Sequence, residues 1–202
     1  SAGDFYSVLY VGLDQHDEKH IGLDKNNNIT KIYNEEENSV MTGKSQFAPW
    51  TGGFGTSLSW KGISLSVDFN WAAKKYMTNN DAFFLQNASQ GYQQNQDVCM
   101  LNVWTKPGDV TMYPNANETP QFDSRYIEDA SFLRLKNLTL SYSFPKNIVN
   151  VMRLSNLVLH FTGRNLWTVT DFTGYDPEPQ TNVYKFAYPN TRQYEFGVEV
   201  SF

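Results

Sequence analysis

The chain has 202 residues and a net charge of -5, so a nucleic-acid-binding surface is not expected. Its single cysteine, Cys99, allows no internal disulfide bond, and its three histidines (His16, His20 and His160) are too scattered to predict a metal site. Aromatic residues make up 15% of a chain whose mean hydropathy is -0.51. This combination is typical of half-apolar strands joined by polar loops, so we expect an all-β fold.

No apolar run approaches the ~20 residues that a membrane-spanning helix needs. Strands of a membrane barrel are only ~9–11 residues long and alternate between apolar and polar residues. The absence of a long apolar run therefore does not exclude a membrane protein built from strands. The sequence begins at Ser1 rather than with an initiator methionine, which is typical of a mature product or a fragment.

Residues 4–11 predict a first strand, and the polar composition of residues 12–46 predicts a long loop. Within this loop, residues 24–28 contain the acidic and amide side chains of a calcium loop. They lack its spaced ligands, its glycine and its closing glutamate. We therefore interpret residues 24–28 as a solvated turn.

Residues 50–60 and 63–72 predict a hairpin, because both alternate with period 2 on either side of a Lys-Gly turn signal. One face is apolar and carries Trp50, Trp60 and Trp71, whereas the other consists of small and polar residues. About ten steps of ~3.3 Å, tilted by ~45°, nearly span the ~25 Å apolar band of a membrane barrel. A sandwich strand with one face in water is the alternative.

Three further strands are predicted at residues 131–144, 154–168 and 192–202. The connections at residues 61–62 and 145–153 are short, whereas those at 12–49, 73–130 and 170–191 are long. Short and long connections alternate in membrane barrels, which have short periplasmic turns and long outer loops. The pattern favours an antiparallel transmembrane β-barrel segment with long extracellular loops.

The chain contains five motifs in this order: Pro49-Trp-Thr-Gly-Gly-Phe54 with Lys61-Gly62; Arg134-Leu-Lys-Asn137 within the strand Ser131–Pro145; Phe161-Thr-Gly-Arg-Asn-Leu-Trp-Thr168; Phe172-Thr-Gly-Tyr-Asp-Pro-Glu178; and Tyr188-Pro189 before the terminal strand. Together they resemble TonB-dependent outer-membrane transporters of the SusC/RagA type. Each motif alone is weakly specific, but five in the same order are strongly so. The resemblance covers residues 45–72 and 130–202 and leaves the loops free.

The resemblance implies that residues 1–202 are the C-terminal part of a receptor barrel and supply about six of about 22 strands. It implies a location in the bacterial outer membrane and the import of oligosaccharides or peptides, not an enzymatic reaction, and no cofactor. A SusD-like surface lipoprotein would capture the substrate, and the TonB complex would act through an N-terminal region that this sequence does not contain. The remaining barrel and the plug domain, also not contained here, are further expected partners, because six strands cannot close a wide barrel.

Candidate contacts with a substrate or partner are Trp104, Tyr113, Tyr175 and Tyr184 in the long loops and Arg164 on a polar strand face. Packing of the loops on each other is the alternative role for the aromatic residues. We interpret Gly174, Asp176, Pro177 and Glu178 as stabilising their loop, rather than as a glycosidase site with two carboxylates. Asn165 is predicted to end its strand and tie down residues 170–178. The expected membrane girdle is Trp50, Trp60, Trp71 and Tyr142.

The terminal strand alternates to the last residue, with Tyr194, Phe196, Val198, Val200 and Phe202 on its apolar face. By resemblance, this face is the signal that the barrel-assembly machinery recognises. The alternative function for the whole chain is a soluble all-β module whose loop aromatics bind glycans. Alternation alone does not separate the two, since soluble strands also have one apolar face, but the motif order and the loop pattern favour the transporter.

Overall fold

The computed structural model describes residues 3–185 and 187–202. The chain divides into two compact units. The sheet unit contains residues 49–73, 131–171 and 188–202, and the loop unit contains residues 1–48, 74–130 and 172–187. Each unit is therefore assembled from three separate segments of the chain.

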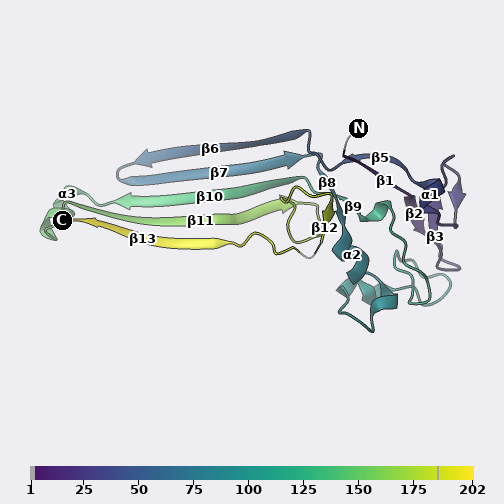
Figure 1. Ribbon diagram of the computed structural model, residues 1–202. Coiled ribbons are helices and arrows are strands. Elements are labelled where there is room, and N and C mark those ends of the chain that lie inside the picture. The colour runs from purple at the N-terminus through teal and green to yellow at the C-terminus, as the bar shows by residue number, and fades with distance from the viewer. Residues whose placement is uncertain (1–2, 186) are drawn as a thin grey trace. The chain divides into compact units, whose positions relative to one another are not determined.

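The sheet unit is one antiparallel sheet of five long strands in the order β13-β11-β10-β7-β6 (Figure 1). The strands are β6 (Trp50–Trp60), β7 (Ile63–Ala73), β10 (Phe132–Ser143), β11 (Asn156–Thr170) and β13 (Gln193–Ser201). Helix α3 (Lys146–Val151) connects β10 to β11. Each strand pairs with the strand of this sheet that precedes or follows it along the chain, so the topology is up-and-down. These strands lie close to five of the ranges that alternation predicts.

The turn between β6 and β7 shows why this hairpin closes in two residues. Lys61 has a φ of 48° and Gly62 has a φ of 89°. Two positive φ values define the type I′ turn, whose twist matches that of the strands. The Ser143 amide donates to the Gly62 carbonyl at 2.8 Å, and a Cβ at Gly62 would lie 2.6 Å from the Ser143 oxygen. The turn therefore packs closely against the end of β10.

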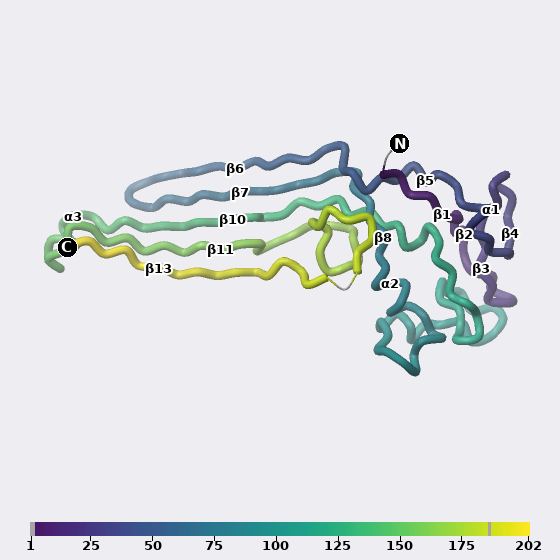
Figure 2. Tube along the Cα trace, viewed as in Figure 1, coloured from purple at the N-terminus to yellow at the C-terminus, as the bar shows by residue number. Residues whose placement is uncertain are grey.

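The described residues of the loop unit form three small sheets. β1 (Asp4–Ser7) pairs with β5 (Val40–Ser45), and β2 (Leu9–Leu13), β3 (His20–Leu23) and β4 (Ile29–Thr30) form a second sheet. The third has the order β12-β8-β9 and consists of β8 (Tyr76–Asn79), β9 (Ile127–Asp129) and β12 (Val183–Tyr184). Short helices complete the unit: α1 (Glu35–Asn38), α2 (Asn80–Leu85), η1 (Ala88–Gln90), η2 (Val98–Asn102) and η3 (Ser124–Tyr126). Figure 2 traces its three segments by colour, in purple, teal and yellow-green.

Two predictions for the loop unit are wrong. The predicted first strand, residues 4–11, divides at the buried Val8 into β1 and β2, which belong to different sheets. No glycine or proline marks this break in the sequence. Residues 12–46, predicted as a loop, contain β3, β4, α1 and β5. Strands this short do not repeat long enough to produce a clear period of 2.

The loop unit has an apolar core of its own. Met77, Ala130, Phe172 and Tyr184 form one buried cluster. Tyr184 and Met77 are its fully buried large side chains, and the Phe172 ring meets the Tyr184 ring edge-on at a centroid distance of 5.5 Å. This cluster joins the segment 74–130 to the segment 172–187. In the part of the chain that the structure describes, we find no helix with the length and apolar character to cross a membrane.

Candidate functional site

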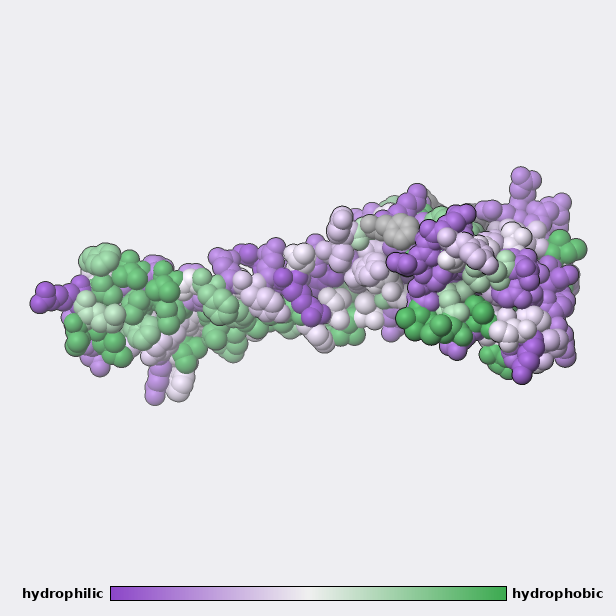
Figure 3. Space-filling model, turned by 90° about the horizontal axis from the view of Figure 1, so that it is seen from below, coloured by the Kyte–Doolittle hydropathy of each residue, from purple (hydrophilic) through white to green (hydrophobic). Residues whose placement is uncertain are grey.

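The apolar side chains of the sheet unit gather on one face of the sheet. The register places Leu65 beside Leu140, Leu140 beside Phe161, and Phe161 beside Phe196. An apolar row therefore crosses four neighbouring strands. Near α3 this face has a groove of about 370 Å³, lined by Ile63, Leu140, Ser141, Tyr142, Leu159, His160, Phe161 and Phe196. Figure 3 shows apolar residues gathered over this end of the sheet.

Aromatic residues occupy both ends of this apolar face. Trp60 and Tyr142 both lie beside Ile63 at the end that carries the β6–β7 turn. At the opposite end, Trp71 pairs with Gly52 and Trp50 pairs with the last residue of β7. A soluble sandwich would cover such a face with a second sheet. The sheet unit contains one sheet, and Trp50 and Trp60 are 62% and 68% exposed.

The opposite face of the sheet is polar. Ser57 donates to Ser66 at 3.2 Å, and the Ser59 and Ser64 hydroxyl groups are 2.9 Å apart, so these cross-strand hydroxyl pairs follow the register. Arg164 lies on this face, where its guanidinium group is 3.4 Å from the Glu195 carboxylate and 3.5 Å from the Gln193 side-chain oxygen. These contacts join β11 to β13. The structure therefore places Arg164 on the polar face, as alternation predicts, and leaves its side chain exposed.

The motif around Asn165 forms an irregularity within β11. The register skips Lys136 on β10 and residues 165–166 on β11, and Asn165 has a φ of 54°. Leu166 turns back over Gly163, where a Cβ would lie 2.6 Å from the Leu166 Cδ1 atom. The glycine of the motif therefore makes room for the leucine of the same motif. Asparagine is one of the few residues that adopts this left-handed conformation readily.

The predicted role of Asn165 is wrong in two respects. β11 continues past it to Thr170, so Asn165 does not end the strand. Its side-chain amide donates to the Thr191 carbonyl at 3.2 Å, just before β13, and not to residues 170–178. Strand pairing on both sides of the irregularity overrides the tendency of this residue to stop a strand.

The motif of residues 172–178 forms a tightly held loop in the loop unit. A Cβ at Gly174 would overlap the ring of Phe172, so this ring needs a glycine beneath it. Thr173 donates from its amide and its hydroxyl to the Glu128 carboxylate, both at 2.8 Å. Asp176 accepts the Glu178 amide at 3.0 Å and so closes an Asx turn. These contacts stabilise the loop.

A further contact with this loop comes from Lys75, a residue that the sequence pattern does not single out. Its side-chain nitrogen donates to the carbonyls of Pro177, Glu178 and Pro179 at 2.5, 3.1 and 2.6 Å. Lys75 is only 3% exposed. Residues 75 and 177 are 102 positions apart, so no local pattern could reveal this contact.

The structure separates the four loop aromatics. Tyr184 and Trp104 are buried, and the indole of Trp104 donates to the Gln15 carbonyl at 3.1 Å. For these two residues, the expectation of surface contact is corrected to loop packing. Tyr113 is half-buried, and burial raises the pKa of its hydroxyl group. Tyr175 is 67% exposed and is the only one of the four that points its ring largely into solvent.

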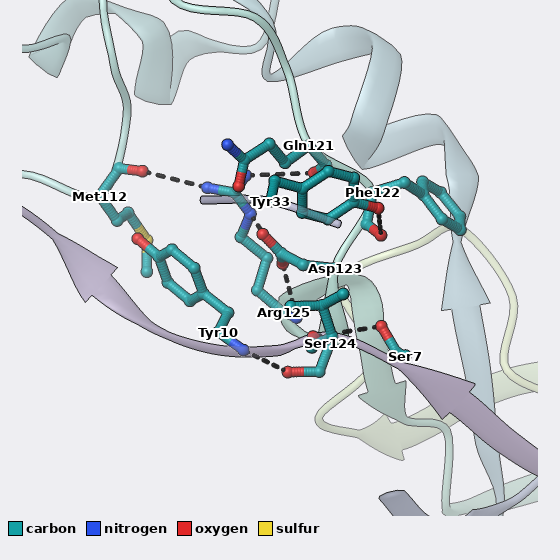
Figure 4. A network of polar contacts seen from close by, with 10 residues as sticks. Ser7, Tyr10, Tyr33, Met112, Gln121, Phe122, Asp123, Ser124 and Arg125 are labelled. Carbon is teal, nitrogen blue, oxygen red and sulfur yellow. Dashed lines mark hydrogen bonds and ion pairs between the residues drawn. The ribbon is translucent and has the colours of Figure 1, made fainter. Parts of the chain in front are cut away.

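A second network, centred on Arg125, holds the segment 74–130 to the N-terminal segment (Figure 4). The Arg125 guanidinium pairs with Asp123 at 3.3 Å and lies over the rings of Tyr10 and Tyr126, at 4.6 and 4.9 Å from their centroids. Ser124 adds two bonds, since its amide donates to the Val8 carbonyl and its hydroxyl accepts the Tyr10 amide, both at 3.0 Å. The network therefore holds together loops whose sequences show no regular alternation.

Burial shifts several pKa values around Arg125. Desolvation, with a further contribution from Arg125, lowers the pKa of His20 to about 4. Desolvation raises the pKa of Asp123, although Arg125 opposes this shift. Desolvation also raises the pKa of Tyr126 to about 12, and the positive charge of Arg125 again opposes this shift. Both ring nitrogens of His20 lack a hydrogen-bond partner among the described residues, so this histidine is held neutral.

Residues 24–28 are held by their own hydrogen bonds. The Asp24 carboxylate accepts the backbone amides of Asn26 and Asn28, both at 2.8 Å, and the Asn28 side chain at 3.1 Å. Within residues 3–185 and 187–202, no cluster of three or more acidic, histidine or cysteine side chains has metal-binding geometry. The geometry of residues 24–28 is that of a turn.

The chain is similar to known proteins both in sequence and in structure. The chain is 29% identical over 167 residues to TonB-dependent receptor P3 of Formosa agariphila, covering 76% of this chain and 16% of that protein. It is 28% identical over 176 residues to TonB-dependent receptor P39 of the same organism, covering 81% of this chain and 17% of that protein. No protein-family model matches the chain.

Among solved structures, the chain is similar to the RagAB peptide transporter, with a TM-score of 0.89 and 38% identity over 98% of this chain. The RagAB peptide importer in its closed-closed state gives a TM-score of 0.86 and 39% identity. The chain covers 22% and 23% of those chains. It thus spans less than a quarter of the relatives that it matches. The chain is a portion of a SusC/RagA-like TonB-dependent transporter of the Gram-negative outer membrane.

Proposed function

We propose that this chain forms part of the wall and the outer loops of a nutrient importer in the outer membrane. The observation that carries the proposal is the two-faced sheet, which has an uncovered apolar face bounded by aromatic residues at both ends. In this proposal the apolar face contacts lipid, and Trp50, Trp60, Trp71 and Tyr142 lie at the two interfaces as a girdle. The polar face lines the aqueous interior.

The edges of the sheet support an assembly with further strands. β6 and β13 each pair with a single strand in the described part of the chain, so each has one open edge. Open edges do not face lipid, because unpaired backbone groups cost several kcal/mol each there. We propose that the remaining strands of a closed barrel of about 22 strands pair with β6 and β13, and that a plug domain lies inside.

The substrate that we propose is a peptide, because solved structures that are similar in fold are of a peptide importer. An oligosaccharide is the second candidate, which the uptake experiment below separates from the first. A SusD-like lipoprotein would capture the substrate at the surface, and the TonB complex would supply the energy. Tyr194, Phe196, Val198, Val200 and Phe202 would form the face that the assembly machinery recognises.

Fractionation of the cells that produce this protein tests the location and the assembly. We expect it in the outer membrane, extractable only with detergent and heat-modifiable on gels, in company with a lipoprotein. Uptake of labelled peptides and oligosaccharides, compared between these cells and cells with the gene deleted, then identifies the substrate. Recovery of a water-soluble 23.2 kDa monomer from native cells would contradict the proposal.

A further inference from the structure

Tyr175 is exposed in a loop in which several other residues are buried. Its neighbours Asp176 and Pro177 are buried, and so is Phe172 at the start of the motif, whereas Tyr175 is 67% exposed. An aromatic ring in this position exposes a large apolar surface with a polar tip. A rigid backbone lowers the conformational entropy that such a side chain loses when it contacts a ligand. The arrangement is that of a presented contact residue.

The rigidity depends on Lys75. An ammonium group carries three N–H donors, and the Lys75 nitrogen lies within hydrogen-bonding distance of three successive carbonyls, those of residues 177, 178 and 179. Three carbonyls can converge on one point only if the backbone curls around it, so the ammonium group fixes the shape of this turn. Because Lys75 is 3% exposed, water would not easily replace it.

The anchor of Lys75 is itself well fixed. The Lys75 carbonyl accepts the Ala130 amide at 2.8 Å, and β8 begins at the next residue and pairs with β9 on one side and β12 on the other. β12 belongs to the same segment as the motif, and the Thr78 amide of β8 donates to the Asn182 carbonyl just before β12 at 2.9 Å. Thr173 is thus fastened to β9 through Glu128, residues 182–184 are fastened to β8, and Lys75 fastens the turn between them.

We propose that Lys75 is a positioning residue for import: its ammonium group fixes the turn 176–179 and thereby holds Tyr175 outward for contact with an apolar side chain of the substrate peptide. This inference rests on the proposed peptide import. It adds to that proposal a contact residue, the buried lysine that positions it, and the kind of substrate side chain that is recognised.

The test uses the whole transporter in its native cells and four variants. Lys75→Met keeps the length and removes the charge, Lys75→Arg keeps the charge, and Tyr175→Ala removes the ring. Lys74→Met is the matched control, because Lys74 is the neighbouring lysine and is exposed. The probes are labelled peptides that either contain or lack large apolar side chains, supplied at a range of concentrations. Surface levels of each variant are measured in parallel.

We expect Tyr175→Ala and Lys75→Met each to raise the apparent KM for the apolar peptides roughly three- to tenfold, with little change in the maximal rate per molecule. The double variant should be no worse than either single variant, since both changes remove one contact. Lys75→Arg should restore part of the affinity. Hydrogen exchange in residues 172–187 should accelerate in Lys75→Met but not in Tyr175→Ala or Lys74→Met.

Several results would overturn the inference while leaving peptide import intact. Wild-type uptake by Tyr175→Ala would exclude the proposed contact between Tyr175 and the peptide. Because Tyr175 is exposed, this variant does not disturb a buried site. Additive defects in the double variant would show that Lys75 acts elsewhere. An equal KM increase for peptides without apolar side chains would exclude the proposed recognition. If the wild-type transporter itself takes up no peptide, or takes up oligosaccharides only, the proposed function fails and this inference fails with it.

Discussion

The two units of this chain reverse the usual relation between regular structure and a buried core. The sheet unit has the long strands, yet among the described residues only Ala72 and Val149 of its apolar side chains are buried. The loop unit consists of short elements and irregular segments, yet it contains the other buried apolar residues, including Met77, Tyr126 and Tyr184. The sheet therefore relies on its surroundings for burial, whereas the loops carry their own core.

This difference shows what each sequence pattern encodes. The strands specify two faces and leave both to be covered by something outside the unit, such as lipid, water or other parts of the protein. The loops specify contacts between distant segments, such as Tyr33 with the Phe122 carbonyl at 2.8 Å and Lys44 with the Ile127 carbonyl at 3.0 Å. Substitutions in the two units should therefore act through different forces: contact with the surroundings in the sheet unit, and contacts between segments in the loop unit.

The largest effect is expected from a charge in the middle of the apolar face. Val67 lies midway between the aromatic ends of this face, and Ser66 precedes it on the polar face. If the apolar face meets lipid, Val67→Arg should cost roughly 2–4 kcal/mol. Ser66→Arg is the matched control and should cost little. The measurement is the amount of heat-modifiable transporter in the outer membrane; equal amounts for the two variants would contradict the assignment of the faces.

The next effect is a loss of stability in acid, confined to the loop unit. His20 has a pKa of about 4 in the folded chain, below its ordinary value of 6.5. Unfolded chains therefore bind a proton first as the pH falls, and stability that is present above pH 6.5 is lost as the pH drops toward 4. The loss reaches at most about 3 kcal/mol by this linkage.

Hydrogen-exchange protection at pH 7.5 and 4.5, corrected for intrinsic rates, checks this pH dependence in β2 and β3 against β10. His20→Phe should abolish this pH dependence, because a phenylalanine ring takes up no proton. The variant should still fold, since the ring edge toward Tyr10 is kept and neither ring nitrogen of His20 has a hydrogen-bond partner to lose in the described chain. His16→Phe, at an exposed histidine, should leave it unchanged. The same decline in His20→Phe as in the wild type would refute the role of His20.

A smaller effect is expected at the irregularity in β11. Gly163→Ala places a Cβ 2.6 Å from Leu166. Overpacking of this kind typically costs roughly 1–3 kcal/mol. The combined change Gly163→Ala with Leu166→Ala should recover part of the loss, as measured by the urea midpoint of the detergent-solubilised transporter. If the double variant is less stable than Gly163→Ala alone, the contact does not limit this position.

No effect is expected from calcium on the loop unit. The Asp24 oxygens already accept three hydrogen bonds from Asn26 and Asn28. Adding calcium or a chelator should therefore leave the exchange protection of residues 20–30 unchanged. Increased protection with calcium, reversed by the chelator, would show that a metal site forms there.

The sequence predicts the sheet well because its signal is local. Alternation places Leu138, Phe161 and Phe196 on one face without any knowledge of their partners, and the register agrees. The sequence predicts the loop unit poorly for the opposite reason. The partners of Lys75 lie 102 to 104 positions away, and nothing near Lys75 in the sequence distinguishes it from the exposed Lys74.

The candidate contact residues show the same limit. The sequence identifies four loop aromatics with equal weight, but burial separates Tyr175 from Tyr184 and Trp104. Burial in the loop unit depends on which segments meet, and those meetings are not periodic. The motif around Tyr175 does predict an ordered loop, since Gly174 and Asp176 suit a tight turn, but it does not reveal which residue supports that loop.

The three-segment construction of the loop unit has a consequence for engineering. Ser124 binds the segment 1–48 to the segment 74–130, and Lys75 binds the latter to the segment 172–187. A graft of any one of these loops into a related protein would leave its partner loops behind. The buried polar groups of the grafted loop would then lose their hydrogen-bond partners. Exchange of surface properties between such proteins should therefore succeed when all three loops are transplanted as a set, and should fail when they are moved one at a time.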